Sequence, residues 1–345
     1  MVVAHVFNLN RKRIIFRPPG SAWTSNIINN MNVSLLLTIR PRAVALLLCV
    51  AVLAAALPRV CAQTTAEGST TEAIQSGGLE RAFVLHVGKT IDPTRPAALV
   101  VVLHGSGGNG KQMERATGFD KIADREGFIV AYPSGIGKHW NDGRRALRFD
   151  VVKDVDDVQF LRDLVAAVEK NHKVDARRVF CTGMSNGGFM SNRAGVEASD
   201  LFAAIAPVSG TLSITYADRI KSKFAISVLV IHGTKDGVVP YQGGTIGADG
   251  PDGMCLGAPE IVTKWVRADH APQDAITRLL PDTDPDDGCR VTESVHAGPE
   301  ATVEFLSIAG GIHAWPGGGS KKQGICQDID GSEIIWGFFK VHPKP

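Results

Sequence analysis

The stretch Val179–Met190, "VFCTGMSNGGFM", decides the fold, because it changes from a strand pattern to a helix pattern at one serine. Residues 179–182 are mostly apolar, which favours a strand, and the residues from Phe189 onward favour a helix. Between them, residues 183–187 match the pattern G-x-S-x-G. In this pattern a sharp turn presents Ser185 as a nucleophile, and the glycines leave room for neighbouring backbone. The alternative is a glycine-rich connection whose serine has no chemical role.

Apolar runs that suit strands alternate with amphipathic runs that suit helices along most of the chain. Strands that are buried on both faces and separated by helices form a mostly parallel sheet with helices on both sides. We therefore predict a single α/β domain, in which the Pro-, Gly- and Asp-rich stretch 241–299 crosses the carboxyl ends of the strands around one helix. The expected strands are 81–87 at an edge, 97–105, 128–133, 177–183, 202–210, 226–233 and 301–310, and the expected helices are 110–127, 154–172, 187–198, 258–269 and 332–340.

Residues 1–62 are predicted to be an N-terminal extension followed by a secretory signal peptide. The apolar run 43–57, "AVALLLCVAVLAAAL", follows two arginines and is shorter than the roughly 20 residues that a membrane span needs. Residues 60–62, "VCA", suit signal peptidase, and a start at Met31 gives a better-proportioned signal. The alternatives are an uncleaved anchor and a lipid attached to Cys61. We expect a secreted or periplasmic protein with no stable membrane association after cleavage.

The remaining chain is expected to contain a flexible leader at 63–78 and the folded domain at 79–345. The full chain has 37 basic and 35 acidic residues, but seven of the basic residues lie in the first 62, which contain no acid. The mature chain then has a net charge of −5 rather than +2. Nucleic-acid binding favours a basic patch, so this composition argues against a nucleic-acid partner.

Four cysteines follow the predicted signal peptide. Cys181 lies in an apolar strand pattern and is expected to be a buried thiol. Cys255 and Cys289 bracket one helical segment and are the first candidates for a disulfide in an exported protein. With Cys326 included, three full pairings remain open, and the spacing resembles no zinc site.

A serine hydroxyl needs a base and a group that orients the base before it can act as a nucleophile. Asp236 follows a predicted buried strand in "IHGTKDGVVP", where a carboxylate can hold an imidazole. His313 follows the last predicted strand in "IAGGIHAWPGG", with glycines that let the loop reach the serine. The order serine, aspartate, histidine is that of the α/β-hydrolase fold. We expect His104 and His232, at the ends of strands, to make structural hydrogen bonds instead.

The segment 103–110, "LHGSGGNG", has the form of a loop that stabilises an oxyanion. The expected donors are the backbone N–H groups of Ser106 and of Asn186, the residue after the nucleophile. The alternative, a phosphate-binding loop, is rejected because the segment lacks G-K-[ST] and the spacing of a dinucleotide fingerprint.

Two tryptophans stand near these motifs in the sequence. Trp315 is two residues after His313, and Trp140 lies in the loop after the strand that ends at Pro133. Either could serve ordinary packing, but near a cleft both would suit an aromatic or polymeric acyl group. We predict that both contact substrate.

Together the motifs "LHGSGGN", "YPSG…WND", "VDDVQFLRDLV", "GMSNGG", "IHGTKDGVVPY" and "GGIHAWPGG" resemble the bacterial polyhydroxybutyrate depolymerase-like esterases, a group that includes feruloyl and acetylxylan esterases of carbohydrate esterase family 1. The resemblance extends from about Gly78 to Lys340. It implies an α/β-hydrolase fold, a secreted location and no cofactor. It also implies that Ser185 is the nucleophile, Asp236 the acid and His313 the base.

Departures from the family pattern bear on the substrate. Ile312 and Ala314 replace two small or polar neighbours of the histidine, and the cysteine often seen after the helix at 258–269 is missing, so a familiar disulfide is absent or rerouted. No appended substrate-binding module follows, which favours a soluble or oligomeric ester over crystalline polymer. The expected substrates are feruloylated or acetylated polysaccharide fragments or short hydroxyalkanoate oligomers. An acyltransferase, a peptidase and a non-catalytic binding protein are the alternatives.

Overall fold

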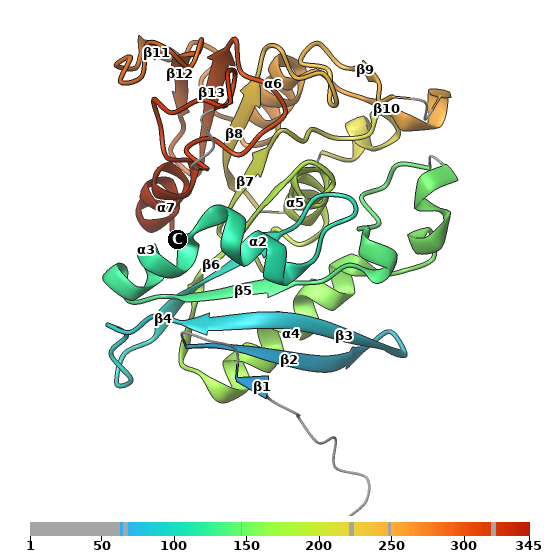
Figure 1. The fold of residues 1–345 in the computed structure, drawn as a ribbon, viewed down its shortest axis with the longest axis vertical. Coiled ribbons are helices and arrows are strands. Elements are labelled where there is room, and N and C mark those ends of the chain that lie inside the picture. The colour runs from blue at the N-terminus through green and yellow to red at the C-terminus, as the bar shows by residue number, and fades with distance from the viewer. Residues whose placement is uncertain (1–62, 65–67, 146, 221–223, 248–249, 319–321) are drawn as a thin grey trace, which may run out of the picture. The chain divides into compact units, whose positions relative to one another are not determined.

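The computed structural model describes residues 63–345, apart from 65–67, 146, 221–223, 248–249 and 319–321. The predicted signal peptide and its start at Met31 lie outside the described residues. The described residues belong to one compact unit, whose elements are drawn in Figure 1. Within the described ranges, no helix is both long enough and apolar enough to cross a membrane.

Eleven strands form one sheet in the order β1-β2-β3-β5-β4-β6-β7-β8-β13-β12-β11 (Figure 1). The six strands from β5 to β13 in this order are parallel, and the flanking strands pair antiparallel. The predicted mostly parallel α/β sheet is therefore confirmed. The strands are β1 (Gln63–Thr64), β2 (Ser69–Ser76), β3 (Leu79–Val87), β4 (Ala97–Leu103), β5 (Ile129–Pro133), β6 (Val174–Met184), β7 (Ala204–Val208), β8 (Ser227–Gly233), β11 (Ile276–Leu279), β12 (Arg290–Ala297) and β13 (Thr302–Ala309), with β9 (Gly244–Thr245) and β10 (Met254–Cys255) in a separate pair.

Helices cover both faces of the sheet because the central strands are apolar on both sides. Every residue of β4 is buried. Successive residues such as Val101 and Val102 point to opposite faces and belong to different core clusters. One cluster takes side chains from α4, α5 and α6, and the other takes them from α2, α3 and α7. The helices are α2 (Gly110–Thr117), α3 (Phe119–Glu126), α4 (Asp157–Asn171), α5 (Asn186–Glu197), α6 (Ala258–Ala268) and α7 (Gly331–Val341), with short 3-10 turns at Ile136–Lys138, Leu147–Val152, Ile214–Arg219 and Gly250–Gly253.

The predicted flexible leader at 63–78 is wrong over most of its length. Residues 69–76 form β2, which pairs along its whole length with β3 from Ser69↔His86 to Ser76↔Leu79. The domain therefore begins before residue 79, and β3 is not the edge strand that its pattern suggested. Most of β2 is only half-buried. Polar and small residues are therefore compatible with this strand, which packs on one side.

Two other predicted elements differ from the structure. The single helix expected at 110–127 is two helices, because Gly118 adopts a left-handed φ of 65° that ends α2 and begins α3. The predicted crossing stretch 241–299 is wrong after α6, because β12 pairs antiparallel with β13 and β11 pairs antiparallel with β12, so both extend the sheet. The proline, glycine and aspartate residues that follow α6 lie mainly in the turns between these strands.

The parallel strands bring four connections to one edge of the sheet. The carboxyl ends of β4, β6, β8 and β13 lead respectively into residue 104, Ser185, the loop of Asp236 and the loop of His313. Ligands of open α/β sheets bind outside the carboxyl ends of the strands. This edge is therefore where the predicted site residues have to meet.

Candidate active site

Ser185 occupies a strained position between β6 and α5. Its φ of 57° and ψ of −121° lie in a region that residues other than glycine rarely adopt, at a typical cost of about 1–3 kcal/mol. The turn is held by hydrogen bonds from Ser185 N–H to the carbonyl of Val208 and from Phe189 N–H to the carbonyl of Ser185, each 2.9 Å long. The side chain of Ser185 is only half-buried and stays accessible. Backbone strain at an accessible serine is what a nucleophile turn requires.

The glycines around Ser185 admit the loop that follows β4. A Cβ atom on Gly187 would lie 2.3 Å from the carbonyl oxygen of Leu103, so only glycine fits there. On the other side, a Cβ on Gly105 would lie 3.4 Å from the Cβ of Ser185. The loop predicted to stabilise an oxyanion therefore borders the serine directly.

Asp236 and His313 form a hydrogen-bonded pair. Nδ1 of His313 lies 2.8 Å from Oδ2 of Asp236, and Oδ1 of Asp236 accepts the N–H groups of Val238 and Val239, both at 2.8 Å. Burial alone would raise the pKa of Asp236, but the hydrogen bonds from His313 and the two N–H groups outweigh it and hold the pKa below its ordinary value. The carboxylate is thus ionised and fixed in place by three donors.

The pairing also sets the state of the imidazole. A carboxylate oxygen only accepts hydrogen bonds, so Nδ1 of His313 carries the proton and Nε2 is left as the acceptor. The side chain of His313 is 18% exposed, whereas that of Asp236 is buried. No hydrogen bond between Ser185 and His313 occurs in the described part of the chain. Such hydrogen bonds are often long without substrate and tighten when it binds.

The two predicted oxyanion donors are Asn186, which follows Ser185 in the chain, and Ser106, which follows Gly105 in the bordering loop. Neither the N–H of Ser106 nor that of Asn186 makes a hydrogen bond to another described residue. Asn186 is the first residue of α5, where backbone N–H groups lack helical partners and the helix dipole favours negative charge. The arrangement is compatible with the predicted role, which stays a prediction.

The side chain of Asn186 has a structural role that the sequence reasoning missed. Its Oδ1 accepts the N–H of Trp140 at 2.8 Å, and its Nδ2 donates to the carbonyl of Trp140 at 3.1 Å and to Oδ2 of Asp142 at 2.6 Å. Asp142 in turn pairs with Arg144, whose Nε lies 3.0 Å from Oδ2. The signal was the "WND" segment, which appeared among the family motifs without an assigned role.

The predicted contact of Trp140 with substrate is wrong. Its side chain is 0% exposed, and Nε1 donates to the carbonyl of His104 at 2.8 Å. The indole packs between the rings of His104 and Phe160. Trp140 therefore supports the loop after β4 from inside the core.

The predicted contact of Trp315 with substrate is also wrong. The indole is 7% exposed, and Nε1 donates to Oγ of Ser332 at the start of α7. It packs edge-on against Phe119 of α3. Its position two residues after His313 places it in the core cluster beneath α3 and α7 rather than toward Ser185.

The structural roles predicted for His104 and His232 are confirmed. Nδ1 of His104 donates to the carbonyl of Gly105 at 2.7 Å, and Nε2 accepts the N–H of Gly135 at 2.9 Å. Nε2 of His232 donates to the carbonyl of Val239 at 3.0 Å, which supports the loop of Asp236. Burial lowers the pKa of His104 to about 4 and also lowers the pKa of His232, so both rings are neutral at pH 7.

The predicted pairing of Cys255 with Cys289 is wrong. All four described cysteines are free and buried, as expected for Cys181. Cys255 packs in a small cluster with Phe189, whereas Cys289 and Cys326 share the core cluster beneath α7. Bracketing one helix in the sequence did not bring Cys255 and Cys289 together, because that helix leads into strands at the outer edge of the sheet.

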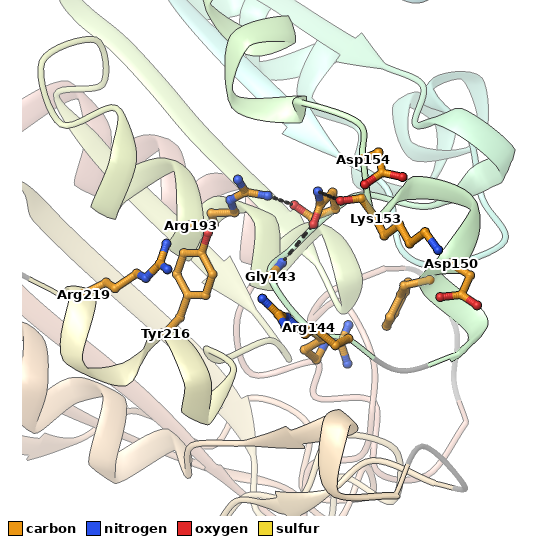
Figure 2. A pocket seen from close by; sticks show the side chains of 11 residues that line it. Gly143, Arg144, Asp150, Lys153, Asp154, Arg193, Tyr216 and Arg219 are labelled. Atoms are coloured by element: carbon orange, nitrogen blue, oxygen red, sulfur yellow. Dashed lines mark hydrogen bonds between the residues drawn. The ribbon is translucent and has the colours of Figure 1, made fainter.

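A cavity of about 490 Å³ lies beside the Asn186 network (Figure 2). Asn141 and Arg144, which flank Asp142, line it, and Arg193 of α5 closes one side by donating to the carbonyl of Asn141 at 2.6 Å. Tyr216 forms a further wall and donates to Glu197 at 2.6 Å. Five of the lining residues are basic and two are acidic, so the cavity is polar and mainly cationic.

Comparisons with known proteins show the family of the chain. The family described as "Esterase PHB depolymerase" matches residues 80–242. The putative esterase NocK of Nocardia uniformis is 32% identical over 263 residues, which cover 72% of this chain and 75% of that protein. Feruloyl esterase B of Piromyces equi is 31% identical over 227 residues, which cover 64% of this chain but only 40% of that protein.

Among solved structures, the acetyl xylan esterase from Aspergillus awamori matches with a TM-score of 0.52 at 16% identity, over 75% of this chain and 94% of that one. At this identity the likeness shows the fold alone. The activity is inferred from the sequence relatives instead. They are named esterases, and their alignments cover most of the folded part of this chain. The chain therefore belongs to the PHB depolymerase esterase family and is a carboxylic ester hydrolase with the α/β-hydrolase fold.

Proposed function

We propose that the protein is a secreted serine esterase that works through Ser185, His313 and Asp236 and an acyl-enzyme. The observation that supports this most strongly is the strained, accessible Ser185 at the sheet edge that also carries the hydrogen-bonded Asp236–His313 pair. A serine hydroxyl needs a base and a group that orients the base, and the Asp236–His313 pair at the same edge can supply both. The strained turn is the backbone form in which α/β-hydrolases present such a serine.

In the proposed mechanism Oγ of Ser185 attacks the ester carbonyl, and Nε2 of His313 takes the proton of the Ser185 hydroxyl at the same time. The ionised Asp236 stabilises the imidazolium that forms. The N–H groups of Ser106 and Asn186 hold the oxyanion, and a single donor of this kind is worth roughly 10²–10³ in rate. His313 returns the proton to the leaving alcohol, and water then releases the acid from the serine by the same steps in reverse order.

The proposed substrates are soluble or oligomeric esters. The relatives include proteins named feruloyl esterase, bifunctional acetylxylan esterase/xylanase and poly(3-hydroxyalkanoate) depolymerase. These names support feruloylated or acetylated polysaccharide fragments and short hydroxyalkanoate oligomers as the substrate classes to compare. A panel of methyl ferulate, acetylated xylan and hydroxybutyrate oligomers ranks them by kcat/KM.

Fluorophosphonate labelling tests the nucleophile directly. The wild type should acquire one label on Ser185, and Ser185→Ala should acquire none. Ser106→Ala removes a nearby hydroxyl but keeps the backbone N–H, so it should label like the wild type. A labelled Ser185→Ala variant, or an unlabelled wild type that hydrolyses esters, would overturn the proposal.

Export is tested separately. The prediction rests on residues 43–57 and on the "VCA" segment before Gln63, which suit a signal peptide and its cleavage site. The protein recovered from the exported fraction should begin at Gln63. A protein that keeps residues 43–57, or that is retained in the cytoplasm, would contradict export with cleavage.

A further inference from the structure

Two buried cysteines that the proposed function does not use lie close together in the fold. Cys289 directly precedes β12, and Cys326 lies five residues before α7. Their side chains are 1% and 2% exposed. Their sulfur atoms and a carboxylate oxygen of Asp287 all lie within 4.8 Å of one another. A disulfide bond needs sulfurs about 2 Å apart, and this proximity makes the two cysteines candidates for one.

Asp287 distinguishes a disulfide from a metal site. Its Oδ1 accepts the N–H of Cys289 at 2.6 Å, and its Oδ2 accepts the N–H of Gln327 at 2.6 Å. Both carboxylate oxygens are therefore already engaged in holding the two cysteine segments side by side. A structural zinc ion takes four ligands, and no fourth metal-binding side chain joins this group among the described residues.

The two sulfurs are uncharged thiols in the reduced protein. Burial raises the pKa of Cys289 to about 12 and the pKa of Cys326 to about 11. A metal ion binds thiolates, so deprotonating both groups in this buried place is unfavourable. Joining them removes both thiol protons and leaves an apolar bond that suits the surrounding core.

We propose that Cys289 and Cys326 form a disulfide bond in the exported protein. The oxidant is a low-molecular-weight or protein disulfide of the exported compartment. One thiolate attacks it to give a mixed disulfide, and the second cysteine thiolate then displaces the carrier thiol. The two cysteines lose two electrons and two protons, and the carrier disulfide gains them as two thiols.

The bond would brace the loop that carries His313. The N–H of Gly317 donates to the carbonyl of Cys326 at 2.8 Å, and the N–H of Gly324 donates to the carbonyl of Asp287 at 2.8 Å. The N–H of Ile312, next to His313, donates to the carbonyl of Gly324 at 2.9 Å. The loop is thus fastened at several points to the turn around Asp287, and a covalent bond between Cys289 and Cys326 closes the loop permanently.

This inference goes beyond the proposed function and depends on export only for the oxidising surroundings. Because both sulfurs are buried, the bond has to form before the core closes, and it is then shielded from reductants. Native protein should therefore resist reduction, whereas protein that is unfolded in the presence of a reductant should lose the bond.

Peptide mapping tests the bond without reference to catalysis. The full chain is refolded in a buffer of reduced and oxidised glutathione, unfolded with an alkylating reagent and digested. The peptides of Cys289 and Cys326 should be joined by a bond that dithiothreitol breaks, and those of Cys181 and Cys255 should be alkylated. Free, alkylated Cys289 and Cys326, a different partner for either, or one tightly bound zinc ion per chain would overturn the proposal.

Thermal unfolding tests the bracing. Refolding without oxidant should lower the melting temperature of the wild type by about 5–10 °C, since a disulfide typically contributes a few kcal/mol. Cys289→Ser should lose this dependence on oxidant. Cys255→Ala, which removes a buried thiol from another cluster, should keep it. Equal melting temperatures for oxidised and reduced wild type would refute the bracing role, and the peptide map decides the bond even if Cys289→Ser does not fold.

Discussion

Two groups of serine, histidine and aspartate in the described part of the molecule can be compared, and their hydrogen bonds alone would favour the group that is not proposed as the site. In the group at β2 and β3, Oγ of Ser69 lies 3.0 Å from Nδ1 of His86, and Nε2 of His86 lies 2.9 Å from Oδ1 of Asp124. In the group at the carboxyl edge, Asp236 and His313 are joined, but Ser185 is joined to neither in the described structure.

The backbone and the surroundings separate the two groups. Ser69 is 2% exposed and starts an ordinary strand, whereas Ser185 is accessible and has a φ of 57°. Ser185 also lies at the start of a helix beside a second loop with a free N–H group, where an oxyanion can be held. Access and backbone strain are thus the features that distinguish the proposed nucleophile from Ser69, whereas a completed chain of side-chain hydrogen bonds does not.

In the group of Ser69, His86 and Asp124, the histidine stabilises the fold. His86 lies between two aspartates, Asp124 and Asp120. Nδ1 of His86 is 3.7 Å from Oδ2 of Asp120. Burial raises the pKa of Asp120 to about 6, although its hydrogen bond from Tyr132 works in the opposite direction. These contacts join β3 to α3 and β5. The group therefore acts as a polar connection between the sheet and the helix that covers it.

The serines give the largest contrast. Ser185→Ala should lower kcat for ester hydrolysis by at least about 10⁴-fold, since loss of a nucleophilic serine costs up to about 10⁶-fold in comparable hydrolases. Ser69→Ala should change kcat by less than roughly threefold, because that serine contacts no substrate. Steady-state kinetics with methyl ferulate or a p-nitrophenyl ester measures both, and a large loss of kcat in correctly folded Ser69→Ala would break the comparison.

The aspartates give the next contrast. Asp236→Asn should lower kcat by about 10⁴-fold, because an amide stabilises neither the tautomer nor the charge of His313. Asp124→Asn should leave kcat nearly unchanged and reduce the free energy of unfolding by about 1 kcal/mol, the usual net worth of a hydrogen bond. The pair is measured by kinetics and urea denaturation, and similar kcat losses in both variants would contradict the assignment.

A pH titration examines a third histidine, His104, which lies in the predicted oxyanion loop and yet has a structural role. The pKa of His104 falls from 6.5 to about 4 in the folded protein, so the unfolded chain binds more protons between these values. The free energy of unfolding should therefore fall as pH drops through this window, by about 3 kcal/mol at 1.36 kcal/mol per pKa unit, and level off below pH about 4.

The matched variant His104→Gln isolates this contribution from that of His232, which titrates in the same direction. The difference between wild type and variant should shrink as pH falls from 6.5 to about 4, in denaturation curves recorded at each pH. A difference that stays constant across this range would show that His104 is not the group responsible.

The smallest effect concerns stability at the group of Ser69, His86 and Asp124. Ser69→Ala should lower the free energy of unfolding by about 1 kcal/mol through loss of the hydrogen bond to His86. Thr277→Ala, which removes an exposed cross-strand hydroxyl contact to Ser294, should change it by less than about 0.5 kcal/mol. Equal effects of the two substitutions in urea denaturation would mean that burial of the Ser69–His86 hydrogen bond does not increase its contribution to the free energy of unfolding.

The sequence predicted the centre of the fold well, for a physical reason. Strands buried on both faces must be apolar throughout, as in β4, and their alternation with helices leaves few arrangements. The edge was harder, because β2 packs on one side only and its threonines and serines are also typical of a linker. Pairing partners, rather than composition, decide such a strand.

The candidate site was predictable where chain position decides the place of a residue. Asp236 and His313 follow strands that end at one edge, and the structure joins them as expected. The tryptophans were not predictable in this way, since an indole near a loop can point into either core cluster. Cys289 met Cys326 rather than Cys255, because contacts between distant segments depend on the finished sheet.

The close crossing at Gly187 has a consequence for recombination between relatives. Because the backbone of Leu103 and His104 runs where a side chain at position 187 would have to be, the two segments have to change together. A chimaera with its breakpoint between residues 110 and 179 would take the proposed oxyanion loop from one parent and the proposed nucleophile turn from the other. Exchanges that keep residues 103–110 and 183–188 from the same parent should therefore inherit activity as a unit.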